Sequence, residues 1–154
     1  MMRPNRWAVI GIMLGAFVFV SSAFAGSGGF VIQGTNIELG EPAEIHIKNA
    51  EGVTQPQPPR FSSTVKKGQV FTLTAQGMTS SRGQAGEPYQ PDSGAWTYDR
   101  AMFREMPPDK KRTDKTAISI RLKAKKTGVS EIHFTGKVLG YENKFDVRVE
   151  VVKR

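Results

Sequence analysis

The 154-residue chain contains no cysteine and only two histidines. The lack of cysteine excludes a disulfide framework, thiol catalysis, a thiolate metal site and a lipid-modified N-terminal cysteine. Acidic residues are the minority, with 14 against 22 basic ones, so the formal net charge is +8. After the first 25 residues, no stretch is apolar enough to span a bilayer. What remains is a cationic chain of the size of one domain.

The first 25 residues have the three-part pattern of a secretory signal peptide. Arg3 and Arg6 form a positive head, Trp7–Val20 is uncharged and apolar, and Ala23 and Ala25 supply a small-x-small cleavage site. We expect a signal helix that is removed, leaving a single domain over 26–154 with 20 basic and 14 acidic residues. An uncleaved membrane anchor is the alternative, because the apolar stretch is close to bilayer length. The predicted location is therefore a periplasm or the extracellular space.

Apolar and polar residues alternate in several short runs after the signal segment. The runs are 44–48, 69–74, 117–122, 130–134 and 144–151. This period of two is typical of half-buried strands, and turn signals with glycine or asparagine separate the runs. Aromatic residues favour another strand at 97–104, although a short helix is open there. We predict an all-β fold, an antiparallel immunoglobulin-like β-sandwich of about seven or eight strands, with a β-barrel as the alternative.

Two stretches lack the strand pattern and are predicted to be long loops. Residues 77–95 are rich in glycine and proline, and residues 104–116 contain two adjacent prolines and a basic cluster. Loops of this length are uncommon in compact domains, and they are usually functional or disordered.

From residue 65 onward, the elements follow a recognisable order. Gly68 precedes the run 70–74, Trp96 follows the first long loop, Gly128 precedes 132–134, and 145–149 closes the chain. This order resembles the chagasin family, the immunoglobulin-like inhibitors of papain-type cysteine peptidases, and it is shared by many bacterial immunoglobulin-like domains. The resemblance implies an immunoglobulin-like fold and, as an alternative function, peptidase inhibition. The inhibitory loops differ, because the Asn-Pro-Thr-Thr-Gly element is absent and Val-Leu-Gly-Tyr replaces Arg-Pro-Trp.

The sequence carries no recognisable catalytic or metal-binding motif. His46 and His133 each face away from their apolar neighbours on an alternating run, and no His-x-His or Met-x-x-Met spacing occurs. No serine stands in a Gly-x-Ser-x-Gly elbow. We therefore predict a non-enzymatic protein with no cofactor and no metal site. A periplasmic metal-handling role is kept as an alternative because of the compartment and the two histidines.

Charge and aromatic residues indicate two candidate binding surfaces. Residues 104–126 contain nine basic and three acidic side chains, which concentrate positive charge on one loop and the outer face of the next strand. Such a patch can steer an anionic partner. Immunoglobulin-like topology would bring aromatic residues together at one loop end, where they are typical recognition anchors. The predicted binding residues are Tyr89, Trp96, Tyr141, Lys110, Lys111 and Arg112. For Trp96, a place in the core is the alternative.

The leading hypothesis is an exported binding or accessory domain that docks a protein or an anionic surface polymer. Nucleic acid is not expected as a partner outside the cytoplasm, and the oligomeric state is left open. A structural component whose edge strand pairs with a neighbour is a further alternative.

Overall fold

The computed structural model describes residues 17–20, 28–43, 46–48, 51, 54–56, 58–81, 84–108 and 114–154. Within these ranges every regular element is a strand, and no helix long and apolar enough to cross a membrane is found among them. The strands are β1 (Phe17–Val20), β2 (Gly28–Thr35), β3 (His46–Lys48), β4 (Thr54–Pro56), β5 (Arg60–Lys66), β6 (Val70–Ser81), β7 (Gln84–Pro88), β8 (Ser93–Thr97), β9 (Phe103–Glu105), β10 (Ala117–Ala124), β11 (Gly128–Val138) and β12 (Tyr141–Val152).

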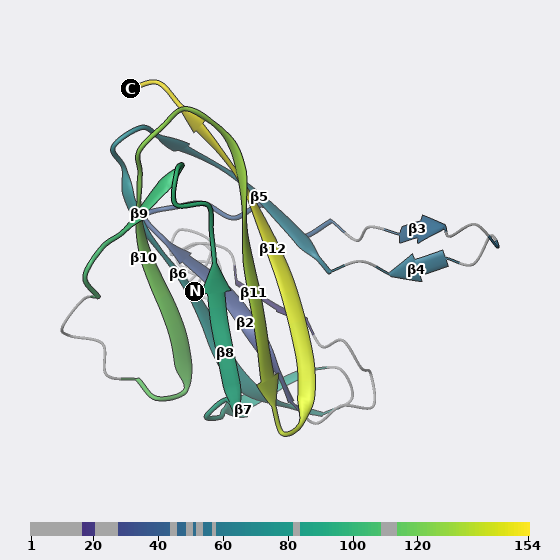
Figure 1. The fold of residues 1–154 in the computed structure, drawn as a ribbon. Helices are drawn as coiled ribbons and strands as arrows, with labels where there is room; N and C mark the ends of the chain where they lie inside the picture. Colours follow the sequence, from purple (N-terminus) through teal and green to yellow (C-terminus); the bar gives the residue numbers. More distant parts are fainter. Residues whose placement is uncertain are drawn as a thin grey trace, which may run out of the picture.

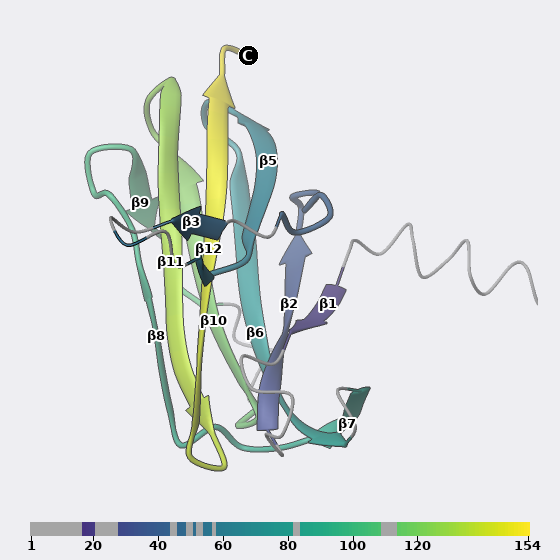
Figure 2. The same ribbon diagram turned by 90° about the vertical axis from the view of Figure 1, so that its right-hand side faces the viewer.

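The strands form two packed sheets and a separate hairpin (Figures 1 and 2). The first sheet has the order β1-β2-β6-β10-β9, with β7 paired to β6, and the second has the order β5-β12-β11-β8. The hairpin β3–β4 projects from the side of the sandwich.

The strand order identifies the kind of sandwich. Seven of the strands carry this order, namely β2, β6, β8, β9, β10, β11 and β12. Numbered one to seven along the chain, strands one, two, five and four lie side by side in one sheet. Strands three, six and seven form the other sheet. This is the strand order of an immunoglobulin-like domain. The predicted fold class is confirmed, with one correction: β5 pairs with β12 in parallel, with Asp146 opposite Arg60 and Val152 opposite Lys66.

Part of the expected signal helix is a strand in the structure. Phe17–Val20 forms β1 and pairs antiparallel with β2, placing Phe17 opposite Gln33 and Val20 opposite Phe30. Phenylalanine and valine have high β-propensity, and the edge of β2 offers the unpaired backbone groups that such a segment can bond. The other residues of the predicted signal peptide lie outside the described part of the chain.

The prediction of a loop over 77–95 is wrong for most of that range. β6 continues to Ser81, β7 follows, and β8 already begins at Ser93. Gly77 is buried in β6, where a β-carbon would lie 2.3 Å from the carbonyl oxygen of Tyr89, so this glycine permits a close approach and does not mark a loop.

The predicted strand over 97–104 is also interrupted. β8 ends at Thr97, and the backbone N–H groups of Met102 and Phe103 both donate to the carbonyl oxygen of Asp99, forming a turn before β9. The carboxylate of Asp99 also accepts from the N–H of Ala101. An aspartate that bonds the backbone two residues on favours such a turn, which outweighs the strand preference of the aromatic residues. In the second expected loop, 104–116, the described residues after Glu105 form no strand.

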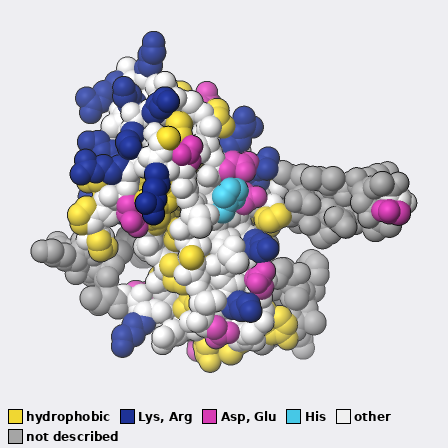
Figure 3. Space-filling view, viewed as in Figure 1, with side chains coloured by type: hydrophobic (Ala, Val, Ile, Leu, Met, Phe, Trp, Pro, Cys, Tyr) yellow, Lys and Arg dark blue, Asp and Glu magenta, His cyan; other side chains and the backbone are white. Residues whose placement is uncertain are grey.

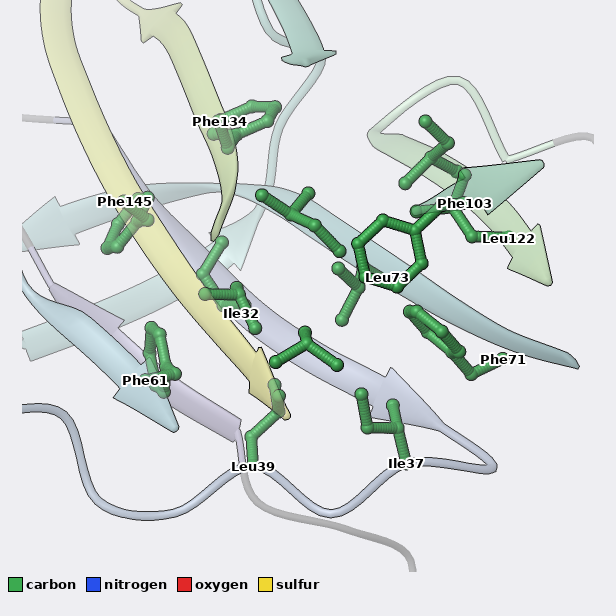
Figure 4. Packing of buried hydrophobic residues seen from close by; sticks show 14 of the residues in the cluster. Ile32, Ile37, Leu39, Phe61, Phe71, Leu73, Phe103, Leu122, Phe134 and Phe145 are labelled. Carbon is green, nitrogen blue, oxygen red and sulfur yellow. The ribbon is translucent and has the colours of Figure 1, made fainter. Parts of the chain in front are cut away.

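One apolar core fills the space between the sheets (Figure 4). Inward positions alternate along β10, β11 and β12, as in the buried series Phe145, Val147, Val149 and Val151 of β12. Phe134 lies at the centre of an aromatic group, with its ring centroid 4.8 Å from Phe30, 4.8 Å from Trp96 and 6.4 Å from Phe145. The period of two in the sequence thus becomes a single core that holds both ends of the sandwich in place.

Candidate binding surfaces

The connections between strands gather at two opposite ends of the sandwich. We call the loop pole the end formed by 86–92, 114–116 and 139–140, and the basic pole the end formed by 66–68, 99–102, 125–127 and 153–154. Strand β12 links them, because its 12 residues begin beside the loop pole and end beside the basic pole. A strand of that length extends over roughly 40 Å.

At the loop pole, Asp92 fastens one connection to another. Its backbone N–H donates to the carbonyl oxygen of Lys137 at 2.8 Å, and its carboxylate Oδ2 accepts from the N–H of Gly140, also at 2.8 Å. Leu139 and Gly140 both have positive φ, at 52° and 82°, which is the conformation of a two-residue type I′ hairpin turn. The segment between β6 and β8 is thereby tied to the β11–β12 hairpin.

A second set of bonds ties in the segment that precedes β10. The N–H of Gly77 donates to the carbonyl oxygen of Thr116 at 2.7 Å, and the amide of Gln76 donates to the same oxygen at 3.2 Å. The hydroxyl and the N–H of Thr116 donate to Asp114 at 2.6 and 2.9 Å. These two bonds stabilise the charged carboxylate and hold the pKa of Asp114 below its usual value.

The structure places Tyr89 within, and Tyr141 directly after, connections that meet at the loop pole. Tyr89 is 41% exposed, and its N–H donates to the carbonyl oxygen of Gly77. Tyr141 is half-buried and follows Gly140 as the first residue of β12. Residues 141–143 already belong to strand β12, and Asn143 is buried. The turn is this short because its two positive-φ positions are residues 139 and 140.

Trp96 is engaged within the domain. Its ring packs on Phe134, and its indole N–H donates to the carbonyl oxygen of Ile118 at 2.9 Å. Because Trp96 is on β8 and Ile118 is on β10, this bond joins the two sheets. Both the apolar and the polar part of the side chain therefore serve the packing of the sandwich.

Of the predicted cationic cluster, Lys110, Lys111 and Arg112 lie outside the described residues. The next strand is described, and there Arg121 and Lys123 alternate with the buried Ile120 and Leu122. The guanidinium of Arg121 donates to the carbonyl oxygen of Pro107 at 3.3 Å, so this arginine also supports the connection after β9.

A larger group of cations lies at the basic pole, where Lys and Arg gather near the C terminus in Figure 3. All seven of its basic side chains are exposed. They are Lys66, Lys67, Arg100, Lys125, Lys126, Lys153 and Arg154. Asp99 is the acidic residue of the same segments. Within the described part of the chain, none of these seven cations takes part in an ion pair.

Backbone hydrogen bonds bring the segments of the basic pole together. The N–H of Lys67 donates to the carbonyl oxygen of Val152, that of Gly68 to Ala124, and that of Lys125 to Met102, at 2.8 to 2.9 Å. Four segments are thus in contact: the turn before β6, the turn after β8, the turn after β10 and the end of β12. Like charges from four separate stretches of sequence share one surface.

Sequence reasoning missed this surface because it counted charge along the chain. Lys67, Lys126 and Arg154 are far apart in sequence, and no single window contains them. In an immunoglobulin-like sandwich, successive connections alternate between the two ends, so summing the charge of alternate connections would have shown the concentration.

A mixed cluster on the outer face of the second sheet was also missed. Glu131, His133 and Asp146 place one ligand atom each within 4.8 Å of one another. His133 is opposite Asp146 in the β11–β12 register, and Nδ1 lies 2.5 Å from the carboxylate. Arg60 supplies a cation to the same cluster, with its guanidinium 3.0 Å from Glu131. The sequence signal for this cluster is a Glu-x-His pattern on one strand opposite an aspartate on the next strand. A search for motif spacing within one stretch of sequence does not detect such a pair.

No protein-family model matches the chain, and no curated protein matches it. Solved structures to which it is similar include chimeric titin Z1Z2 functionalized with a KLER exogenous peptide from decorin, with 10% identity and a TM-score of 0.39, covering 75% of this chain and 98% of that one. Another is the titin M10–obscurin like 1 Ig complex, with 14% identity and a TM-score of 0.37, over 75% and 98% of the chains. The assignment of this chain to the immunoglobulin-like fold depends on its strand order.

Proposed function

We propose that the chain is an exported, non-enzymatic immunoglobulin-like binding domain whose basic pole docks an anionic partner. The observation that carries the proposal is the group of seven exposed cations at one end of the sandwich, unpaired within the described residues. Clustered charge of one sign raises the local concentration of an oppositely charged partner and its rate of association. A polyanionic surface polymer or an acidic protein has the complementary charge.

Export is supported by the sequence pattern of the first 25 residues and by the lack of cysteine. A non-enzymatic role is supported by the lack of a catalytic motif in the sequence and by the use of loop-pole polar groups for fastening connections. The partner is bound by charge at the basic pole, and Tyr89 and Tyr141 offer a second contact surface at the loop pole.

Retention on a heparin column tests the basic pole. The chain should elute at a high salt concentration, and Lys67→Glu with Lys126→Glu and Lys153→Glu should reduce affinity at low salt by at least about tenfold, since three interactions change from attraction to repulsion. The matched control reverses three exposed lysines elsewhere, namely Lys115, Lys137 and Lys144. Equal losses in both variants would show a response to net charge alone and would contradict a docking site at the basic pole.

Peptidase inhibition is the second candidate, and the observation that favours it is the convergence of three connections at the loop pole. The element order resembles that of chagasin-type inhibitors, which act through loops. A papain assay with the purified chain decides it, and Tyr89→Ala with Tyr141→Ala should then raise the inhibition constant. A lack of inhibition at micromolar protein would remove this candidate.

A metal-handling role has the Glu131, His133 and Asp146 cluster in its favour. Nitrogen and oxygen donors of this kind suit divalent transition metals. Arg60 already neutralises Glu131 in this cluster, so we expect a weak site at most. Equilibrium dialysis against zinc and copper that recovers no stoichiometric metal would exclude the role.

A further inference from the structure

The sheet edges of the sandwich differ in how well they are protected. An exposed edge strand presents unpaired N–H and C=O groups, and proteins usually cover such edges, shorten them or place charges and prolines on them. Apart from β7, a five-residue strand with a charge and a proline that pairs with the end of β6, four strands limit the two sheets once the segment of the predicted leader is set aside. These are β5 and β8 in one sheet, and β2 and β9 in the other.

Three of these edges are covered or short. β5 is covered by residues 38–43, because the N–H of Gly40 donates to Ser62, the N–H of Ala43 and that of Arg60 donate to each other's carbonyl oxygens, and the hydroxyl of Ser63 donates to Glu38. β9 has three residues, two of them charged. β8 has five residues, and its Trp96 is bonded to the opposite sheet.

β2 is the exception. It has eight residues with no charge and no proline, and it pairs with β6 over its whole length, from Gly28 opposite Thr79 to Thr35 opposite Thr72. On its other side the structure shows β1, which belongs to the leader (Figure 2). Removal of the leader after Ala25 would leave two residues before β2, too few to fold back as a strand.

We propose that, in the chain without its leader, the edge of β2 pairs antiparallel with β2 of a second copy, joining two sheets across a two-fold axis. This inference rests on the leader removal in the proposed function. β1 shows that the edge accepts an antiparallel strand opposite Phe30–Gln33. Because β2 carries no charge, like residues can face each other across the axis without repulsion.

The position of the charges is compatible with this dimer. A two-fold axis perpendicular to the strands directs the two basic poles to opposite ends of the dimer, so the cations of the two copies are not brought together. The dimer would present one anion-binding pole at each end. It could therefore hold two anionic surfaces, or two sites on one polymer, with the avidity of a bivalent binder.

The test uses the full-length gene expressed in an exporting host. The intact mass of the purified protein shows whether the leader has been removed, and this measurement tests the proposed function separately. For the processed chain, light scattering over a wide range of concentrations should give twice the mass of one chain. Val31→Lys, on the outer face of β2, should weaken dimerisation on the order of tenfold or more, because it adds like charges near the axis.

Val129→Lys is the matched control, since it makes the same substitution at a 52%-exposed position on β11, away from β2. It should leave the dimer unchanged. Hydrogen exchange provides a second measurement: the amides among 30–33 that point away from β6 should be protected in the dimer and should exchange faster in the Val31→Lys variant. A processed chain that stays monomeric, or a dimer in which these amides are not protected, overturns the inference while the proposed function stands. A chain that keeps its leader contradicts both.

Discussion

The two poles of the sandwich are held together in different ways. At the loop pole, side chains fasten the connections: Asp92 binds Gly140, and Gln76 and Asp114 both bind Thr116. At the basic pole, backbone groups of residues 67, 68 and 125 make the joining bonds, and among the described residues Lys125 is the one pole cation whose side chain donates a hydrogen bond. The side chains of the basic pole are therefore available for a partner, whereas several of those at the loop pole are needed for the fold.

Both poles depend on the core between them, so the largest effect is expected there. Phe134→Ala removes the ring that contacts Phe30, Trp96 and Phe145, and should lower the free energy of unfolding by about 3–5 kcal/mol. Chemical denaturation monitored by tryptophan fluorescence measures this. Val129→Ala, at an exposed site, should change stability by less than about 0.5 kcal/mol. A small effect at Phe134 would show that the two ends are stabilised independently.

A direct comparison of the poles comes from one alanine at each. Asp92→Ala removes the acceptor for the N–H of Gly140 and should cost about 1 kcal/mol. Lys67→Ala removes a side chain without a described bond and should stay within about 0.5 kcal/mol. Denaturation midpoints of the two variants measure the difference. Asp92→Asn, which keeps an oxygen acceptor, should recover part of the loss, and equal costs at the two poles would contradict the distinction.

A smaller effect at the loop pole concerns acid. The folded state lowers the pKa of Asp114, so its hydrogen bonds stabilise the fold above the ordinary value of 3.8, and this contribution is lost as the pH falls through the lowered pKa. Asp114→Asn should therefore show a smaller loss of stability on acidification than the wild-type chain. Denaturation curves at neutral pH and below pH 3.8 compare the two. An unchanged acid response would mean that these bonds do not favour the charged carboxylate.

The smallest expected effect tests the independence of the two ends. Tyr89→Ala with Tyr141→Ala should leave retention on heparin unchanged, because both tyrosines lie at the end opposite the cations. A change in salt elution equal to that of the charge-reversal variant would show that one continuous surface binds the polymer.

The alternation of residues predicted the fold well where burial alone decides. The run 144–151 lies within β12, and 117–122 within β10, because the apolar residues at every second position there point into the two-layer core. Prediction failed where a local contact decides. The chain between 77 and 95 was expected to be loop, yet the glycine at 77 is a close-packing position in a strand. The parallel pairing of β5 and the strand β1 depend on edges that exist only in the folded sheet.

The candidate surfaces were harder to predict than the fold, since they combine residues that are distant in sequence. Tyr89 and Tyr141 were chosen from an expected topology, and the structure brings their connections together through Asp92. The cations at positions 67, 126 and 154 belong to different turns, so no motif contains them. A histidine on one strand and an aspartate on its neighbour become a pair only once the register of β11 and β12 is known.

The course of β12 has a practical consequence for handling the protein. Lys153 and Arg154 come directly after the end of β12, and the guanidinium of Arg154 lies against Gly68 in the turn before β6. An affinity tag or fluorescent reporter fused after Arg154 would stand amid the cations and would obstruct whatever they attract. Labels for binding measurements are better carried on the β3–β4 hairpin, which projects from the side of the sandwich (Figure 1).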